Sequence, residues 1–547
     1  MTYDLAFQII FIKIFPLSLF MKLIFILLII KYVSIGCPDY PQPVPLDQND
    51  PTLQKAYAEV DAMIQANMKT YGVQSFVATI VYGDDLVWSK AYGKVDPLNP
   101  QSPDLTIDNT VRIASITKTF TDLMMFQLRD KGVIALDDPI SKYYPNFSIR
   151  DSYHTKRDIT FRELASHQSG LPREVPCNFD LLPTDNCTES IILERLQEHF
   201  LILPQYTTTH YSNLGMALLG RACGKAAHME YEQYVEEKIL APLGMHNSSF
   251  DYNKIKDRMA IGLELWPNGT YLHAPIIGLG WGTPMGGLFA TARDMARYAS
   301  FWLSNESPVL DSSTVKEALS AIYLVNDGQS AYGTPWETFY NQNNNIWVRE
   351  KAGALDGYRS QLAVIRELKL GVFFSSMMYL GLQDLWMSQA LDILIPVYEA
   401  MLYEKNSTPQ LFETIPTSFK KAPTPIPQSA LHGVYEYEGS LFVVQDDTNG
   451  NLIANFGGAP NFNMTLFAQD HPHIYRIKIA DPSIQSCIFV DDGSNYELVY
   501  VKYTDGASHP ESMEVMGQTM PWVSENPSDA QLFEKVKPIR PTNYMRL

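Results

Sequence analysis

The sequence predicts an α+β domain followed by an all-β domain. Strand patterns at residues 74–94 and 349–377 enclose a long, mostly helical middle, which indicates one sheet assembled from distant parts of the chain. Residues 406–430 are rich in proline, threonine and serine and are interpreted as a linker. Beyond it, residues 431–547 contain short alternating β segments separated by turn residues, which predicts a C-terminal barrel or sandwich.

The first 36 residues are predicted to be a targeting segment, either a cleaved signal peptide or an uncleaved membrane anchor. The apolar run Leu23–Ile30 is too short to cross a bilayer, which requires about 20 apolar residues. It follows Lys22 and precedes small residues just before Cys37, as the core of a signal peptide does. We therefore expect the body of the protein in the secretory pathway, either secreted or anchored to the membrane on its lumenal or extracellular side.

The first domain is predicted to span residues 51–405, after a proline-rich linker at 37–50. Pro51 opens a helical pattern that Asp50 can cap, because proline is favoured at the first helical position. Two β-rich runs around a Gly-Asp-Asp turn at 74–94 predict a hairpin. Three later strands and a closing helix are expected at 349–353, 358–365, 369–377 and 382–405.

Cysteine spacing and glycosylation motifs agree with the secretory pathway. Cys177 and Cys187 bracket a loop-like segment, and oxidising conditions favour a disulfide between them. Cys223 lies in an apolar helical pattern and is expected to be a buried thiol. Candidate N-glycosylation sites occur at Asn146, Asn186, Asn247, Asn268, Asn305, Asn406 and Asn463.

The composition excludes several classes of partner. A formal net charge of −18 argues against nucleic-acid binding, which requires a basic patch or stripe. The sequence contains no zinc-site spacing, no Gly-x-Ser-x-Gly elbow and no complete phosphate-binding fingerprint. We therefore expect no metal and no cofactor, and a small-molecule or peptide substrate, with the oligomeric state left open.

A possible nucleophile and base occur together in the stretch RIASITKTFTDLMMFQLRDKG, where Ser115 precedes Lys118 by three residues. Residues i and i+3 share a helix face, so the lysine amine can reach the serine hydroxyl. Serine is also a common helix N-cap, and the same spacing recurs at Ser313–Lys316 and Ser418–Lys421. The apolar neighbours of Lys118 indicate burial, which lowers a lysine pKa and is costly unless the group has a partner or a function.

Two other segments carry polar groups that could complete such a site. The segment HYSNLGMALLG places Tyr211 and Asn213 two residues apart, just before an apolar helical pattern. The segment KAGALDGY places Lys351 in the predicted strand group, followed by small residues, including Gly353, that let a substrate approach the backbone. Neither segment is specific by itself.

Taken in order, these segments resemble the serine β-lactamase and penicillin-binding-protein superfamily, with greatest similarity to class C enzymes and animal β-lactamase-like proteins. The resemblance covers roughly residues 55–400. It implies an antiparallel sheet flanked by helices, with a helical insert. The segments that carry it are GDDLVWSKAYGKVD, VRIASITKTF, GVIALDDPISKYYP, ITFRELASHQSGLP, YSNLGMALLG, APLGM, GGLFATARDMARYASFWL and KAGALDGYRSQLAVI.

By matching position, the resemblance implies a role for each polar residue. Ser115 is the acylated residue and Lys118 its activating base, while Tyr211 helps to move protons to the leaving group and to the deacylating water. Whether Lys118 or Tyr211 is the base for acylation stays open. Asn213 is expected to hydrogen-bond the acyl side of the substrate, and Lys351 to support Tyr211 and attract a substrate carboxylate.

The resemblance also implies an oxyanion hole and shows one departure. The backbone N–H groups of Ser115 and Ala354 are expected to bind the oxyanion, an interaction worth about 3 kcal/mol per donor. Relatives usually carry a hydroxyl residue after the third-motif lysine, whereas this chain has Ala352, which weakens carboxylate recognition and counts against β-lactam turnover. His167, in SHQSGLP, matches no catalytic position and is expected to shape a loop.

Two functions follow as hypotheses. The first is a secreted or membrane-tethered serine hydrolase that acts on an ester, amide or peptide through an acyl-enzyme. The alternative is a non-catalytic binding or self-assembling protein that retains the fold. The presence of all four polar groups, Ser115, Lys118, Tyr211 and Lys351, favours the enzyme, and Ala352 mildly favours the alternative.

Overall fold

Two compact units make up the chain, Tyr40–Pro409 and a second unit that contains Gln410–Leu547. No helix within the described ranges is both long and apolar enough to cross a membrane. The computed structural model describes residues 43–155, 157–179, 181–182, 187–304, 307–379, 381, 384–405, 426–437, 440–456, 464–469, 471–479, 497–515 and 517–525. The predicted targeting segment and most of the second linker lie outside these residues.

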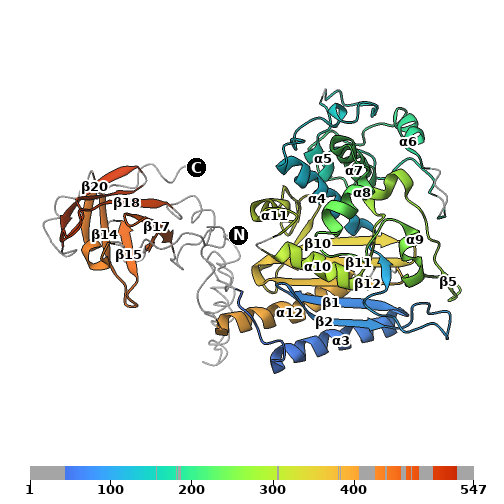
Figure 1. The fold of residues 1–547 in the computed structure, drawn as a ribbon, viewed down its shortest axis with the longest axis horizontal. Helices are drawn as coiled ribbons and strands as arrows, with labels where there is room; N and C mark the ends of the chain where they lie inside the picture. The colour runs from blue at the N-terminus through green and yellow to red at the C-terminus, as the bar shows by residue number, and fades with distance from the viewer. Residues whose placement is uncertain are drawn as a thin grey trace, which may run out of the picture. The chain divides into compact units, whose positions relative to one another are not determined.

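An eight-stranded antiparallel sheet forms the centre of the first unit (Figure 1). Its order is β2-β1-β12-β11-β10-β9-β8-β7, so the N-terminal hairpin joins the late strands through β1 and β12. This pairing confirms a sheet assembled from distant parts of the chain. The strands are β1 (Phe76–Tyr82), β2 (Asp85–Tyr92), β7 (Tyr323–Leu324), β8 (Ser330–Tyr332), β9 (Glu337–Asn341), β10 (Ile346–Leu355), β11 (Tyr358–Ile365) and β12 (Leu370–Ser376).

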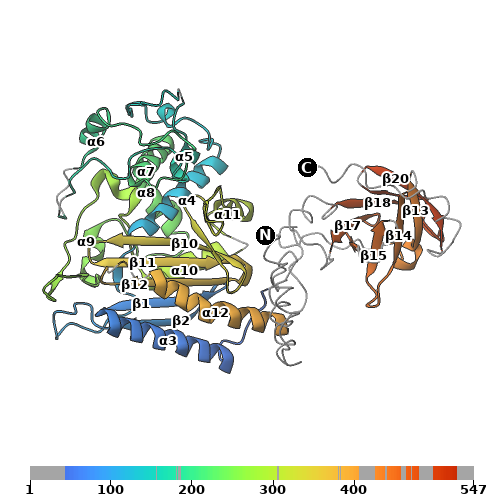
Figure 2. The ribbon, with the colours of Figure 1, turned by 180° about the vertical axis from the view of Figure 1, so that it is seen from behind.

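Helices cover both faces of this sheet, and the side chains of β1 show why. Successive residues of a strand point to opposite faces. Phe76 and Ile80 pack in the core beneath α3 (Pro51–Tyr71) and α12 (Asp384–Lys405), whereas Val77 packs in the core that includes α10 (Ala292–Leu303). Figures 1 and 2 show α3 and α12 side by side along one face. Strand β1 is therefore buried on both sides, and most of its residues are apolar.

The start of α3 follows the predicted capping pattern. The side chain of Asp50 accepts a hydrogen bond from the backbone N–H of Thr52 at 2.8 Å, and Pro51 is the first helical residue. The helix ends at Gly72, whose φ of 72° lies in the left-handed region that glycine adopts without strain. Local capping interactions therefore define both ends of α3.

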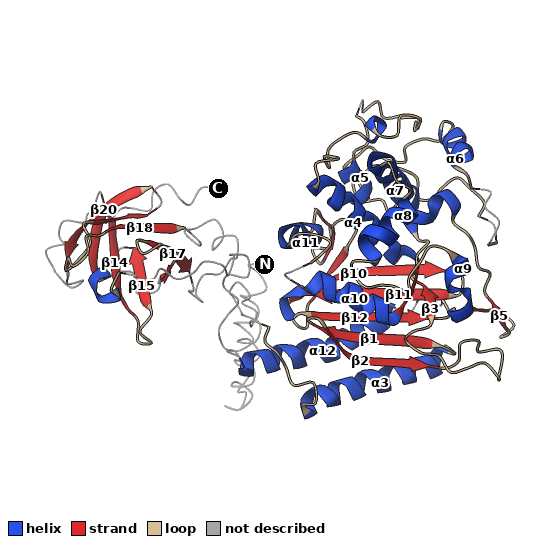
Figure 3. Ribbon diagram, in the orientation of Figure 1, coloured by secondary structure: helices blue, strands red, loops and turns tan. Residues whose placement is uncertain are grey.

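The helical insert lies between β2 and β7 and forms a lobe on the α10 side of the sheet (Figure 3). Its helix α4 is buried almost all round, from Thr117 to Leu128. Short strands β3 (Thr110–Arg112) and β6 (Phe289–Thr291) pair with each other at the base of this lobe. The helices are α4 (Thr117–Asp130), α5 (Phe161–Ala165), α6 (Glu189–Leu196), α7 (Asn213–Ala227), α8 (Tyr231–Val235), α9 (Tyr252–Ile255), α10 and α11 (Ser312–Ala318), with 3-10 turns η1 (Ala114–Ile116) and η5 (Gly280–Met285).

The second unit is a closed eight-stranded barrel, which decides between the two predicted architectures. Each strand pairs with the next, and β13 pairs with β20 to close the ring. Its interior is filled by apolar side chains such as Tyr435, Phe442 and Met464. The strands are β13 (Gly433–Tyr437), β14 (Ser440–Asp446), β15 (Leu452–Phe456), β16 (Met464–Ala468), β17 (Ile474–Ile479), β18 (Leu498–Lys502), β19 (Ser512–Val515) and β20 (Gln518–Ser524).

Candidate active site

Ser115 lies in a tight turn between β3 and α4. Ala114, just before it, has a φ of 48°, a left-handed conformation that is uncommon for a residue with a side chain and that often marks functional sites. Strand β10 presses against this turn, because a Cβ at Gly353 would lie 2.2 Å from the carbonyl oxygen of Ile113 and 2.8 Å from the Ser115 nitrogen. Only glycine allows so close an approach. Ser115 does not cap α4, whose N-cap residue is Ile116.

Lys118 is positioned to act on Ser115. Its Nζ lies 2.8 Å from the Ser115 Oγ and also donates a hydrogen bond to the carbonyl oxygen of Met285. The side chain is fully buried, as its apolar neighbours predicted. Burial lowers the pKa of Lys118, and the positive charge of Lys351 lowers it further. A lysine in this environment can be neutral and accept the serine proton.

Tyr211 lies between the two lysines. The Nζ atoms of Lys118 and Lys351 are 5.0 and 4.9 Å from the centroid of its ring. Burial alone would raise the pKa of Tyr211, but the positive charges of Lys351 and of the protonated form of Lys118 outweigh this effect and the pKa is lowered, with a further contribution from a hydrogen bond to Ser115. Ser115, Lys118, Tyr211 and Lys351, predicted from three separate segments, are therefore brought together in one site.

Lys351 has a partner that the sequence did not indicate. Its buried Nζ donates a hydrogen bond to the Glu337 carboxylate at 2.6 Å, from β10 to the neighbouring strand β9. Burial would lower the pKa of Lys351, but Glu337 and Tyr211 raise it overall, so this lysine stays charged. Glu337 was missed because its segment matches no catalytic motif, and only the pairing of β9 with β10 places it here.

The edge of β10 beside Ser115 has no partner strand among the described residues. Strand β9 pairs with Ile346–Glu350, whereas β11 pairs with Arg349–Leu355. One edge of Lys351–Leu355 is therefore available to a ligand, and it contains Ala354, the predicted second oxyanion donor. An extended substrate can hydrogen-bond to such an edge.

His167 supports Tyr211 from the loop after α5. The ring centroids of the two residues are 4.5 Å apart, and the His167 Nδ1 accepts a hydrogen bond from the backbone N–H of Ser212 at 3.2 Å. Burial, together with the charges of Lys351 and Lys118, holds the pKa of His167 well below its usual value, so the ring is neutral. The contacts are those of a residue that shapes a loop and positions the tyrosine.

Asn213 begins α7 and is held by a carboxylate. Its Nδ2 donates to both oxygens of Glu174, at 3.1 and 2.9 Å. Ser212, between Tyr211 and Asn213, is extended, so the side chains of its two neighbours point to the same side. Arg173 and Glu174 were also missed from the sequence, because nothing in their local pattern distinguishes them from an ordinary exposed pair.

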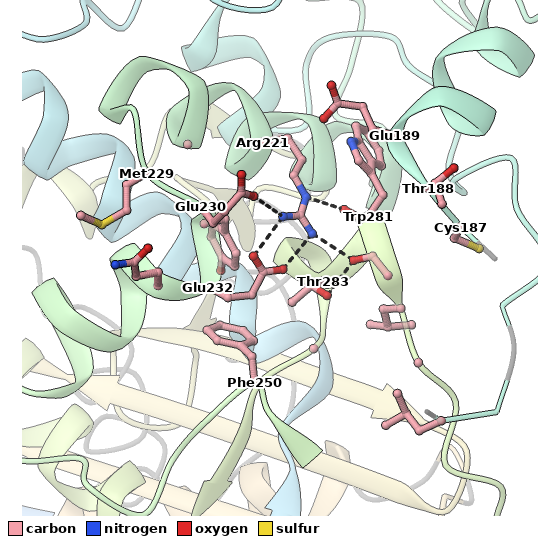
Figure 4. Close-up of a pocket in the computed structure, with 18 of the residues that line it drawn as sticks. Cys187, Thr188, Glu189, Arg221, Met229, Glu230, Glu232, Phe250, Trp281 and Thr283 are labelled. Atoms are coloured by element: carbon pink, nitrogen blue, oxygen red, sulfur yellow. Dashed lines mark hydrogen bonds and ion pairs between the residues drawn. The ribbon is translucent and has the colours of Figure 1, made fainter. Parts of the chain in front are cut away.

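A pocket of about 880 Å³, with the Arg221 side chain at its centre, is lined by none of the predicted catalytic residues but is connected to them through η5 (Figure 4). Arg221 pairs with Glu232 at 2.8 Å and donates to the carbonyl oxygens of Gly280 and Trp281, both at 2.9 Å. These carbonyls belong to η5, the turn whose last residue, Met285, accepts the hydrogen bond from Lys118. Arg221 therefore fixes the segment that holds the lysine.

The other predicted residues are placed as follows. Cys177 and Cys187 form a disulfide with a Cα–Cα distance of 5.9 Å, and Cys223 is a buried free thiol. Among the candidate glycosylation sites, Asn146 and Asn268 are exposed and Asn247 is half-buried. The remaining four, Asn186, Asn305, Asn406 and Asn463, lie outside the described residues.

Comparisons with known proteins agree with this fold, and the chain belongs to the beta-lactamase family, whose sequence profile matches residues 60–377. The chain is 55% identical over 507 residues to beta-lactamase-like protein 2 of Dictyostelium discoideum, covering 90% of this chain and 92% of that protein. The octameric penicillin-binding protein homologue from Pyrococcus abyssi superposes with a TM-score of 0.55 at 20% identity, covering 85% of this chain and 99% of the other.

A beta-lactamase/D-alanine carboxypeptidase from Yersinia pestis, solved with citrate, is also similar. It has a TM-score of 0.54 and 25% identity, and the match covers 63% of this chain and 99% of that one. These matches confirm the resemblance and the β-lactamase/transpeptidase-like fold inferred from the ordered motifs. Family and fold together are those of serine hydrolases.

Proposed function

We propose that this chain is a serine hydrolase that cleaves an ester, amide or peptide through an acyl-enzyme on Ser115. The observation that carries the proposal is the 2.8 Å contact between the Ser115 hydroxyl and the fully buried amine of Lys118. An amine whose pKa is lowered by burial can act as a base near neutral pH, and this activates an adjacent hydroxyl.

The contacts support a reaction in which Ser115 is first acylated and then freed by water. The Ser115 Oγ attacks the substrate carbonyl while its proton passes to Lys118 or to Tyr211, both of which have a lowered pKa. The tetrahedral oxyanion is bound by the N–H groups of Ser115 and Ala354. The C–O or C–N bond then breaks, and Tyr211 delivers the proton to the leaving group. Water attacks the acyl-enzyme by the reverse proton path and releases the acid product.

The leaving-group side of the site favours substrates other than β-lactams. Ala352 lacks the hydroxyl that relatives use beside the lysine, and the charge of Lys351 is already neutralised by Glu337 at 2.6 Å. A carboxylate on the leaving group therefore gains little from Lys351. We propose esters and amides with an uncharged leaving group as the substrates.

The compartment is also part of the proposal. The N-terminal signal-like segment, the seven sequons and the Cys177–Cys187 disulfide support an oxidising, lumenal or extracellular location. Secretion and membrane anchoring both fit these features. Protease protection in intact vesicles, with a shift in mobility after glycosidase treatment, tests this part independently of catalysis.

A fluorophosphonate probe separates the enzyme from the alternative of a non-catalytic binding or self-assembling protein. We expect the intact mass of the purified protein to increase by one adduct, and Ser115→Ala to show none. A protein that takes up no probe, or an adduct that persists in Ser115→Ala, contradicts the proposed function.

A further inference from the structure

Arg173 is a third cation against the ring of Tyr211, and it differs from the two lysines in exposure. Its guanidinium carbon lies 5.1 Å from the ring centroid, close to the corresponding lysine distances. The Lys118 and Lys351 side chains are buried, whereas 61% of the Arg173 side chain is exposed. Of the three basic side chains that lie against the Tyr211 ring, the exposed one is therefore an arginine.

The Arg173 guanidinium is held in place with one edge unused. Its Nε lies 3.2 Å from the Glu174 carboxylate, whose oxygens also accept from Asn213. No described residue bonds to Nη1 or Nη2 of Arg173. These two groups form the planar fork that binds a carboxylate with two parallel hydrogen bonds.

The backbone at Arg173 is fixed as well. Its carbonyl oxygen accepts from the N–H groups of Asn213 and Leu214 at the start of α7, at 2.7 and 3.3 Å. The Ser212 hydroxyl donates to the preceding carbonyl, that of Pro172, at 2.6 Å. These hydrogen bonds fix the backbone from which the Arg173 side chain extends, so that less of the segment has to be ordered when a ligand binds.

The guanidinium charge also acts on groups beyond the Tyr211 ring. It helps to lower the pKa of the buried His167 ring, after burial and the charges of the two lysines, and it opposes the rise in the pKa of the Tyr332 phenol that burial causes. The position of Arg173 over the Tyr211 ring therefore also places its charge where it influences residues from the loop after α5 and from β8.

We propose that Arg173 is the specificity-determining residue of this site and that it binds a carboxylate on the acyl part of the substrate. The inference rests on the proposed function, in which Asn213 lies beside the acyl part, and Glu174 links Asn213 to Arg173. Lys351 is occupied by Glu337, so the free fork of Arg173 takes over recognition of the anion. The substrate class is a half-ester or half-amide of a dicarboxylic acid, or an acidic aminoacyl group.

The test compares aryl half-esters of glutarate and adipate with the neutral pentanoate and hexanoate esters of the same phenol, each corrected for uncatalysed hydrolysis. We expect kcat/KM of the wild type to be about tenfold or more higher for the half-esters, the size expected for hydrogen bonds to a charged group. Arg173→Gln should reduce this preference to near unity, and Arg173→Lys should restore only part of it. Because Arg173 is exposed, added salt should also weaken the preference.

Arg150→Gln is the matched control. Arg150 also lies over an aromatic ring, 5.4 Å from the centroid of Phe200, and pairs with an exposed carboxylate, that of Glu198, away from Ser115. The preference should be unchanged in this variant. The inference is overturned if the wild type shows no carboxylate preference or if the preference survives Arg173→Gln. In either case, fluorophosphonate labelling of Ser115 would still support the hydrolase. Loss of both labelling and hydrolysis overturns the two together.

Discussion

The chain contains the same Ser-x-x-Lys spacing across the turn that leads into α4 and within α11, and the two places differ in what surrounds it. On α4, Lys118 is fully buried and Ser115 lies at its amine, next to Tyr211. On α11, Ser313 is exposed and Lys316 is only partly buried, because this helix buries Thr314, Val315 and Ala318 instead. The third occurrence, Ser418–Lys421, lies outside the described residues.

The difference shows that desolvation, rather than spacing, makes the pair chemically useful. A solvated lysine keeps its usual pKa and stays protonated at neutral pH. Burial among apolar side chains, with Lys351 close by, makes the charged form of Lys118 less stable. The following predictions compare the two helices, from the largest expected effect on catalysis to the smallest.

Replacing the two serines should give the largest contrast. Ser115→Ala should abolish ester hydrolysis and covalent labelling, because it removes the nucleophile, while thermal stability changes little. Ser313→Ala should leave both activities at the wild-type level. Steady-state hydrolysis and a melting curve on each variant check this, and a wild-type rate in Ser115→Ala would show that another residue is acylated.

Replacing the two lysines should give the next largest contrast. Lys118→Met keeps most of the side-chain volume and should lower kcat by about 10²–10⁴-fold, the usual contribution of a general base. Lys316→Met should have no effect on kcat. Lys118→Ala should in addition lower the free energy of unfolding, because it opens a cavity in a packed helix. Equal rates in Lys118→Met and the wild type would exclude this lysine as the base.

The effect of charge on the pKa values of the site residues can be tested with a pH profile of a Glu337 variant. The negative charge of this glutamate raises the pKa of Lys118, Tyr211 and Lys351. Glu337→Gln should therefore lower all three, and the acid limb of kcat/KM should move to lower pH. Glu367→Gln, which removes a carboxylate paired with Arg349 on the same sheet, is the control and should leave the limb in place. A shift to higher pH in Glu337→Gln contradicts the assignment.

Asp122, one turn after Lys118, should affect stability rather than catalysis. It is fully buried, neither carboxyl oxygen has a described hydrogen-bond partner, and burial raises its pKa well above the usual value. The folded state therefore holds a proton that the unfolded state releases above about pH 4, so this residue lowers stability as pH rises. In the wild type, the free energy of unfolding should fall as the pH rises. In Asp122→Asn this fall should be shallower, by up to about 1.4 kcal/mol per pH unit. Identical slopes between pH 4 and 7 would contradict a protonated Asp122.

The sequence predicted best those features that are determined by residues close together in the chain. The capped start of α3, the hairpin of β1 and β2, and the contact between Ser115 and Lys118 were all predicted, because caps, alternation and ordered motifs are read within a few residues. Glu337, Met285 and Arg173 were not, since strand pairing and loop packing bring them to the site from distant segments. Closure of the barrel depends in the same way on the pairing of β13 with β20, which no local pattern specifies.

The central claim is that burial of Lys118 within this cluster makes Ser115 nucleophilic near neutral pH. The most direct test is the rate of fluorophosphonate modification of Ser115 as a function of pH, followed by intact mass in the wild type and in Lys118→Met. We predict a wild-type rate that rises through an apparent pKa below the 10.5 of an ordinary lysine, and a rate at least a hundredfold lower, about the lower limit for loss of a general base, in the variant. A wild-type rate that rises only at or above pH 10.5, or equal rates in the two proteins, would contradict the claim.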